Sequence, residues 1–210
     1  MAVTAGLSLL TLLALQAAAQ DPMYFEIGKD LTFDPKPSEA INAITWKHNE
    51  IIVAEYVKDK YPLEYLGDLK GRLTLDVTTG ILTISNMRKS DDGVFTVEIN
   101  QRVLPVKFKA VGVRKLDDYP VEVILRPPTC YPTLACGVSL NEAEPVQYFW
   151  KKGEAGEWEE GGRKLVISKE TEQVKTFTCR AKNRYSDVTS EPFKNPFSEC
   201  CLNHTGWRRH

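Results

Sequence analysis

The chain has 210 residues, of which 42% are hydrophobic and 26% are charged, and its formal net charge is -1. This balance is typical of folded globular proteins and excludes fibrous and intrinsically disordered classes. Because there is no surplus of positive charge, we do not expect nucleic acid as a partner.

Residues 1–19 have the features of a secretory signal. They carry no charged side chain, and their apolar run ends in three alanines, the small residues that a signal peptidase reads. The run is shorter than the ~20 residues that a membrane-spanning helix needs. We therefore expect cleavage before Gln20 and an extracellular protein, secreted as the sequence is written and held at the cell surface if an anchored form exists.

The first half of the remaining chain has the pattern of a β-sheet protein. Apolar and polar residues alternate in short runs, with Gly, Asp, Asn and Pro between them, and no helical period is sustained from residue 20 to residue 129. The predicted strands cover residues 31–33, 44–47, 51–56, 72–76, 81–85, 94–100 and 104–109. The charged stretch 113–120 ends in proline and is the expected linker.

The second half repeats this scheme. Its predicted strands cover residues 121–125, 133–138, 146–151, 165–168, 175–183 and 187–190, and the Gly- and Glu-rich stretch 153–162 is expected to be a loop. The sequence thus predicts an all-β chain of two small sandwich domains.

All five cysteines lie in the second half: Cys130, Cys136, Cys179, Cys200 and Cys201. In an oxidising compartment we expect disulfides rather than metal ligands or nucleophiles, and the odd number leaves one thiol over. A zinc site built from Cys200, Cys201, His204 and His210 is the less favoured alternative.

Trp150 lies 14 positions after Cys136 and 29 positions before Cys179. This spacing resembles the immunoglobulin fold, in which the tryptophan packs on a disulfide that joins the two sheets. The resemblance implies a Cys136–Cys179 bridge in a constant-type domain over residues 116–201, without extra edge strands. Phe177 stands where that fold usually has a tyrosine.

The first half carries the same pattern without cysteines. Trp46 follows Phe33 by 13 positions, and residues 91–97 (DDGVFTV) resemble the corner and strand F of a variable-type domain, here residues 20–115. Phe33 and Val97 take the two cysteine positions, and Phe95 also faces the core. Burying two apolar side chains stabilises the fold by about 1.5–3 kcal/mol each. This offsets the stabilisation of about 3–4 kcal/mol that the missing disulfide would give. We expect Arg72 to pair with Asp91.

Together these features resemble the ectodomains of the signalling lymphocytic activation molecule family. The resemblance rests on residues 44–47, 53–56, 71–76 and 80–86 and on Cys130, six positions before Cys136. It implies two tandem immunoglobulin-like sandwiches, with a second bridge from Cys130 to Cys200 or Cys201. Asn203 begins the only glycosylation sequon, in a polar tail over residues 202–210.

The resemblance also implies a function in leukocyte adhesion. The partner would be a receptor of the same immunoglobulin family on an opposing cell, bound weakly through strands C, C′, C″, F and G of the first domain. Strand alternation places five residues on that face: Thr45, Lys47, Thr96, Glu98 and Asn100. Lys107 follows on strand G, and the C and C′ region adds His48, Glu50, Glu55 and Lys58. A secreted decoy for the same receptor and a homophilic module or homodimer are the alternatives.

The sequence does not favour an enzyme. Its only histidines are His48, His204 and His210, and no phosphate-binding glycine loop or dinucleotide motif is present. We therefore expect no catalytic residue, no cofactor, no metal site and no small-molecule substrate.

Overall fold

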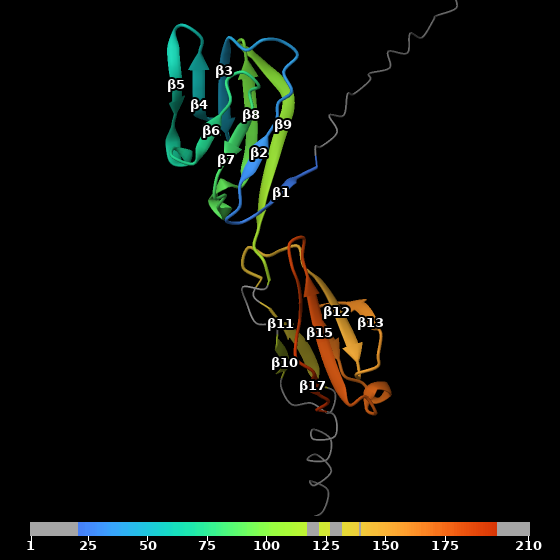
Figure 1. Ribbon diagram of the computed structural model, residues 1–210. Coiled ribbons are helices and arrows are strands. Elements are labelled where there is room, and N and C mark those ends of the chain that lie inside the picture. The colour runs from blue at the N-terminus through green and yellow to red at the C-terminus, as the bar shows by residue number, and fades with distance from the viewer. Residues whose placement is uncertain (1–20, 117–121, 127–131, 139, 197–210) are drawn as a thin grey trace, which may run out of the picture.

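The computed structural model describes residues 21–116, 122–126, 132–138 and 140–196. These residues form two β-sandwiches that lie end to end and are connected through the long strand β9 (Figure 1). Three short 3-10 turns are the only helical elements in the described part. None of its helices is long and apolar enough to cross a membrane.

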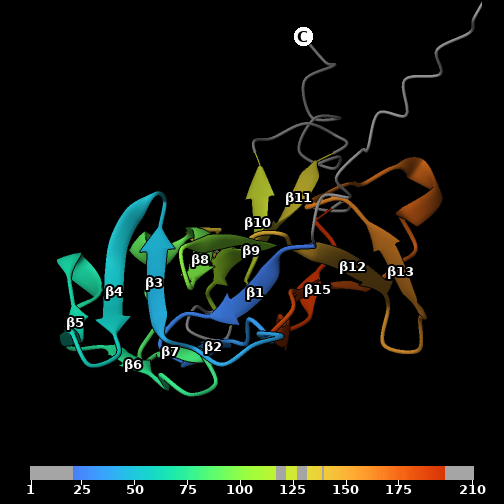
Figure 2. The ribbon, with the colours of Figure 1, turned by 90° about the horizontal axis from the view of Figure 1, so that it is seen from above.

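The first sandwich has a six-stranded and a three-stranded sheet. The large sheet has the order β1 (Met23–Glu26), β9 (Arg102–Val113), β8 (Gly93–Ile99), β3 (Ala43–His48), β4 (Ile51–Val57) and β5 (Tyr61–Tyr65). The small sheet has the order β2 (Leu31–Phe33), β7 (Leu82–Ile84) and β6 (Leu73–Leu75). Strand β1 runs parallel to β9, and the other pairs are antiparallel. In the view from above, β5 and β4 lie toward one edge of the large sheet and β1 lies toward the other (Figure 2).

Aromatic rings fill the core of the first sandwich. The Phe33 ring centroid lies 4.6 Å from that of Phe95 and 5.2 Å from that of Phe108, and Trp46 lies 6.0 Å from Phe33. The Trp46 indole N–H donates to the carbonyl oxygen of Gly80 at 3.1 Å. Gly80 has a φ of +76°, which favours glycine at this position. This cluster joins the two sheets where the fold usually has a disulfide.

The second sandwich has the same two-layer form. One sheet has the order β10 (Glu122–Arg126), β11 (Thr133–Gly137) and β14 (Lys164–Val166). The other has the order β13 (Trp158–Gly161), β12 (Gln147–Lys152), β15 (Thr176–Lys182) and β16 (Asp187–Thr189), and β17 (Phe193–Lys194) also pairs with β15.

A disulfide between Cys136 and Cys179 joins the two sheets of the second sandwich, which confirms the predicted bridge. Both cysteines are fully buried. Trp150 lies opposite Cys179 in the strand register, and its indole N–H donates to the Gly162 carbonyl oxygen at 3.0 Å. Phe177 is also fully buried, so its ring fills the core without needing a hydrogen-bond partner.

Four strands were not predicted: β1, β5, β13 and β17. The expectation of a loop over residues 153–162 was wrong in its second half, because β13 pairs with β12 there. This strand also corrects the expectation of no extra edge strand. Strand β5 contains Pro62, which an edge strand tolerates because its free side needs no N–H donor.

The connection between the sandwiches is fixed at its start. Strand β9 continues to Val113, and Leu116 is fully buried in the core of the second sandwich. The Asn183 side-chain amide donates to the Arg114 carbonyl oxygen at 2.7 Å, and the Leu116 N–H donates to the Ser186 hydroxyl oxygen at 2.7 Å. Val113, the first residue of the predicted linker, thus ends a strand of the first sandwich, and Arg114 and Leu116 are bonded to the second.

Candidate functional site: the outer face of the large sheet

The large sheet of the first sandwich has one side packed on the core, and the described part of the chain places no strand on its other side. In β3, the buried Ile44 and Trp46 alternate with Thr45 and Lys47. Figure 2 shows the small sheet on one side of the large sheet. We call the opposite side of β9, β8, β3, β4 and β5 the outer face.

Carboxylates form a row across the outer face. The strand register aligns Glu98 of β8 with Thr45 of β3, Thr45 with Glu55 of β4, and Glu55 with Glu64 of β5. We call Glu98, Glu55 and Glu64 the carboxylate row. Glu55 and Glu64 are direct cross-strand neighbours, an arrangement in which like charges destabilise the sheet.

Lysines lie on the same face, one step further along the strands. Lys107 of β9 lies opposite Thr96 of β8, which lies opposite Lys47 of β3. Lys109 lies two residues beyond Lys107, opposite Val94. We call Lys47, Lys107 and Lys109 the lysine group. Because β9 runs toward the second sandwich, this group lies nearer to that sandwich than the carboxylate row does (Figure 1).

One ion pair connects the two groups. The Lys47 ammonium nitrogen lies 3.7 Å from a Glu98 carboxylate oxygen, and the two side chains are 29% and 32% exposed. Such an exposed pair contributes only about 0.2–1 kcal/mol. Within the described ranges, no ion pair is formed by Glu55, Glu64 or Lys109.

Apolar side chains accompany the charges. Tyr61 of β5 is 57% exposed and Val103 of β9 is 61% exposed, and they lie toward opposite edges of the outer face. A shallow hollow of about 410 Å³ is lined by Glu55, Tyr61, Pro62 and Glu64. The sequence interpretation missed Tyr61, Glu64 and Val103. The alternation of apolar and polar residues within 61–65 could have revealed β5, but Pro62 argues against a strand at this position.

Most of the residues predicted for partner binding lie on or beside this face. Thr45, Lys47, Glu55, Glu98 and Lys107 project from its strands. Thr96 also points outward but is only 8% exposed, so neighbouring side chains cover most of it. Two more of the ten predicted residues, Glu50 and Lys58, lie in the turns at the two ends of β4.

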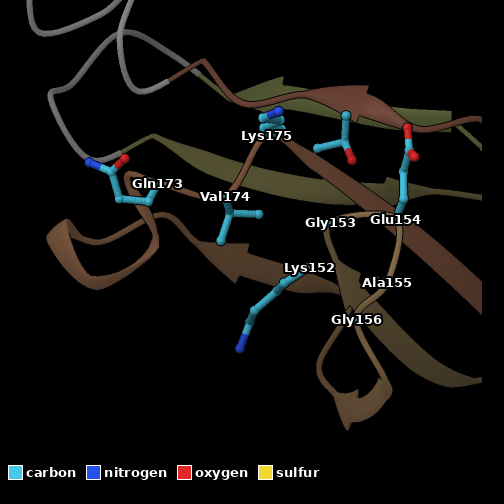
Figure 3. Close-up of a pocket in the computed structure, with 9 residues that line it drawn as sticks. Lys152, Gly153, Glu154, Ala155, Gly156, Gln173, Val174 and Lys175 are labelled. Carbon is cyan, nitrogen blue, oxygen red and sulfur yellow. The ribbon is translucent and has the colours of Figure 1, made fainter.

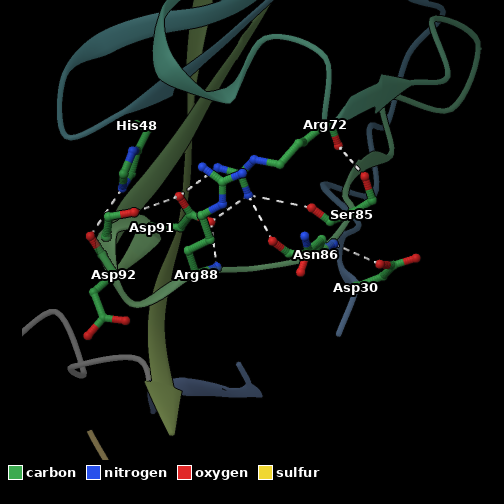
Figure 4. A network of polar contacts seen from close by, with 9 residues as sticks. Asp30, His48, Arg72, Ser85, Asn86, Arg88, Asp91 and Asp92 are labelled. Carbon is green, nitrogen blue, oxygen red and sulfur yellow. Dashed lines mark hydrogen bonds and ion pairs between the residues drawn. The ribbon is translucent and has the colours of Figure 1, made fainter. Parts of the chain in front are cut away.

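The prediction for His48 does not hold. Its imidazole stacks on the ring of Phe95, a core residue, with centroids 4.3 Å apart and planes 10° from parallel. Its Nε2 atom lies 3.2 Å from the carbonyl oxygen of Asp92 (Figure 4). His48 continues the inward series of Ile44 and Trp46, so strand alternation alone removes it from the outer face.

Asn100 has an internal structural role instead of an outward one. Its side-chain oxygen accepts hydrogen bonds from the N–H groups of Asn42 and Ala43 at 2.9 and 3.1 Å, and its amide nitrogen donates to the Ala40 carbonyl oxygen at 2.9 Å. Its φ of 50° places it in a turn. Asn100 thus joins the turn after β8 to the segment that enters β3.

A polar network closes the end of the sandwich nearest the second sandwich (Figure 4). Arg72, expected to pair with Asp91, donates two hydrogen bonds to that carboxylate at 2.7 and 2.9 Å. The Arg88 N–H donates to the same carboxylate at 2.7 Å. Burial opposes ionisation of Asp91, but these bonds and the Arg72 charge lower its pKa below the usual value. The bond to Asp91 likewise raises the pKa of Arg72.

Several predictions lie outside the described residues. These are the second bridge from Cys130 to Cys200 or Cys201, the alternative zinc ligands and the sequon at Asn203. Within the described ranges, no group of three or more His, Cys, Asp or Glu side chains could hold a metal ion.

The second sandwich has a hollow of its own, of about 420 Å³, between residues 152–156 and 173–176 (Figure 3). The Lys152 ammonium group is already paired with Glu159 at 2.6 Å. Lys175 is a surface side chain. Neither lysine is therefore a buried, unpaired group of the kind that fixes a small-molecule ligand.

Neither the family models nor the curated protein sequences give a match. Among solved structures, the CD2-binding domain of CD58 (lymphocyte function-associated antigen 3) is similar, with a TM-score of 0.59, 22% identity, and coverage of 83% of this chain and 96% of that one.

Two further structures resemble most of the two-domain chain. Murine CEACAM1b gives a TM-score of 0.59 at 16% identity and covers 81% of this chain and 94% of its own. The amphioxus IgVJ-C2 molecule gives a TM-score of 0.52 at 18% identity, and the match covers 82% of this chain and 100% of that one. At these identities the likeness establishes the fold. The chain consists of two tandem immunoglobulin-like β-sandwiches, the first held by an aromatic core and the second by a disulfide.

Proposed function

We propose that this protein is an extracellular recognition ligand that binds an immunoglobulin-superfamily receptor of leukocytes through the outer face of its first sandwich. The observation that carries the proposal is the outer face itself. Among the residues that the structure describes, no other strand covers this sheet surface, which carries Lys47, Glu55 and Lys107 together with the exposed Tyr61 and Val103.

The composition of the face supports a protein partner. Aromatic residues are enriched at the centre of interfaces, and charged side chains at the rim select the partner by matching opposite charges. The hollow beside Tyr61 is shallow and flanked by Glu55 and Glu64, and it has no buried apolar floor of the kind that small-molecule sites use.

The similar structures support the same assignment. The structure of CD58 is described as a CD2-binding domain, and this chain covers 96% of it. We carry over from it only the class of function, a domain that binds another cell-surface protein.

Binding should be weak and reversible. Exposed ion pairs contribute about 0.2–1 kcal/mol each, and transient signalling contacts bury less than about 1,200 Å². The expected dissociation constant is therefore in the micromolar range, with fast dissociation.

Tetramers of the full chain test the proposal on cells that each express one leukocyte immunoglobulin-superfamily receptor. Staining of cells with one receptor is expected, with loss of staining for the Lys47→Glu/Glu55→Lys tetramer. A tetramer of Glu160→Lys/Lys164→Glu, two exposed residues of the second sandwich, is the matched control and should stain as the unaltered protein does. Equal staining by all three tetramers would place the binding site elsewhere, and no staining of any receptor would reject the proposal.

A further inference from the structure

A hollow of about 570 Å³ lies where the two sandwiches meet. Tyr24 of β1 and Val111 of β9, which are neighbours in the strand register, form its wall on the first sandwich. Leu140, Pro145 and Val146 form its wall on the second sandwich. Small-molecule sites have volumes in this range and walls that are mostly apolar, so the hollow has the size and the lining of such a site.

Contacts between the sandwiches hold the two walls in place. The guanidinium carbon of Arg184, in the second sandwich, lies 4.6 Å from the centroid of the Tyr24 ring. A cation at this distance from an aromatic ring is attracted to it. The Lys115 ammonium nitrogen lies 3.5 Å from a Glu26 carboxylate oxygen and ties the connection to β1. The hollow is therefore formed before any ligand enters it.

A buried hydroxyl of this hollow has no hydrogen-bond partner. Tyr148 of β12 lines the hollow and is only 9% exposed. Among the residues that the structure describes, its hydroxyl oxygen is the one buried side-chain oxygen or nitrogen without a partner. Burying an unpaired hydroxyl is costly, so a bound group that pairs with it would gain free energy. Burial also raises the pKa of Tyr148, so the hydroxyl keeps its proton at neutral pH and offers it as a donor.

Two charged side chains, Arg163 and Glu144, also line the hollow. Next to burial, they are the groups that shift the pKa of Tyr148, so both lie near its hydroxyl. The Arg163 guanidinium is held by hydrogen bonds to the carbonyl oxygens of Cys136 and Val138, both at 3.2 Å. Arg163 is half-buried and Glu144 is exposed, and within the described ranges neither forms an ion pair. Because water screens the exposed carboxylate more strongly, the surroundings of the Tyr148 hydroxyl favour an anion.

We propose that this hollow binds a small amphipathic monocarboxylate, of the class of medium-chain fatty acids. The carboxylate accepts a hydrogen bond from the Tyr148 hydroxyl beside the Arg163 charge, and the apolar chain packs on Val111, Leu140 and Val146. Because solvent barely reaches the hydroxyl in the free chain, the entering carboxylate displaces a side chain of the rim. No residue of the outer face that carries the proposed function lines this hollow, so the two proposals stand or fall separately.

Calorimetric titration of the full chain at pH 7 tests the choice of ligand with three probes of equal chain length: octanoate, octanol and octylamine. We expect octanoate to bind at one site and the other two to bind at least about fivefold more weakly, because a hydrogen bond to a charged group is stronger than one to a neutral group. The absence of saturable octanoate binding up to about 10 mM, a range in which even weak sites fill, would overturn the proposal. Tighter binding of octylamine would also overturn it, because the hollow would then select a cation through Glu144.

Tyr148→Phe tests the role of the hydroxyl, because it removes only that oxygen. Octanoate should bind about tenfold more weakly to this variant, as expected for the loss of one bond to a charged group. The melting temperature should stay the same or rise, since the oxygen has no partner in the described part of the free chain. Tyr185→Phe removes the hydroxyl of a half-buried tyrosine that does not line the hollow, and should bind octanoate as the unaltered chain does.

Two outcomes for Tyr148→Phe would contradict the proposal. Unchanged octanoate affinity would show that the hydroxyl does not contact the ligand. A lowered melting temperature would show that the hydroxyl is already hydrogen-bonded in the free chain, so that it is not a site for a ligand.

Glu144→Gln gives a test of opposite sign. Removing this carboxylate from the rim should strengthen octanoate binding and weaken any binding of octylamine. Glu154→Gln makes the same change of charge at an exposed position that does not line the hollow, and should change neither affinity. Weaker octanoate binding by Glu144→Gln would contradict the placement of the ligand carboxylate in this hollow.

Discussion

Arg72 and Asp91 form a two-pronged ion pair across the end of the first sandwich, with nitrogen–oxygen distances of 2.7 and 2.9 Å. Arg72 directly precedes β6 of the small sheet, and Asp91 ends the 3-10 turn that leads into β8 of the large sheet. The pair thus joins the two layers. The Arg72 guanidinium also donates to the carbonyl oxygen of Asn86 at 3.1 Å (Figure 4). It therefore also holds the segment that connects β7 to this 3-10 turn.

Replacing Asp91 should strongly destabilise the first sandwich. In Asp91→Asn the side chain keeps its size, but the Arg72 charge, whose side chain is only 13% exposed, loses its partner. Removing one member of a buried pair costs about 3 kcal/mol or more. Urea unfolding should show this loss, whereas Asp187→Asn, at an exposed pair of the second sandwich, should cost less than about 1 kcal/mol.

The Arg72–Asp91 pair should make the free energy of unfolding depend on pH. The Asp91 pKa is lowered in the folded chain, so the unfolded chain binds a proton at a higher pH than the folded one. The stabilisation is complete above the unfolded value of 3.8 and decreases as the pH falls below it. The difference in free energy of unfolding between the unaltered chain and Asp91→Asn should therefore shrink from pH 5 to pH 2. A constant difference would contradict this account.

Truncating a side chain of the aromatic core should destabilise the first sandwich more than truncating an exposed side chain of one of its strands. Phe33 is fully buried and contacts the rings of Phe95, Trp46 and Phe108. Phe33→Ala removes these contacts and leaves a cavity, which costs about 3–5 kcal/mol. Thermal unfolding should show a large decrease in the melting temperature of the first sandwich. Thr32→Ala, at the exposed neighbour in the same strand, is the control and should change it little.

Leu116 should stabilise the second sandwich although it lies at the end of the connection from the first. It is fully buried among residues that include Leu134 and Ile167. Leu116→Ala should cost about 2–5 kcal/mol. Calorimetry should show a lower transition temperature for the second sandwich and an unchanged one for the first. A shift of the first transition instead would show that Leu116 belongs to the first folding unit.

Much of the fold could be predicted because its signals are local. The spacing of Cys136, Trp150 and Cys179 predicted the disulfide and the core tryptophan, and alternation predicted β2, β3, β4 and β8 to within one or two residues. The core-facing side chains of β2 and β3 alternate with outward ones, and β4 and β8 also carry buried apolar residues, so the sequence records the orientation of these strands.

The errors have physical causes. Strand β13 lies at a sheet edge with mostly exposed side chains, so it lacks an apolar alternation. His48 is polar, yet it faces inward because it stacks on Phe95. The carboxylate row could not be predicted as a whole either, because Glu64 joins it only through the pairing of the unpredicted strand β5 with β4.

The central claim is that the outer face of the first sandwich binds a protein partner. Surface plasmon resonance with the partner found by tetramer staining, or with immobilised copies of the chain itself, tests it through Lys47→Glu/Glu55→Lys. Both side chains lie on the outer face away from the core, so we expect loss of binding with an unchanged melting temperature. Unchanged binding by this variant would contradict the account.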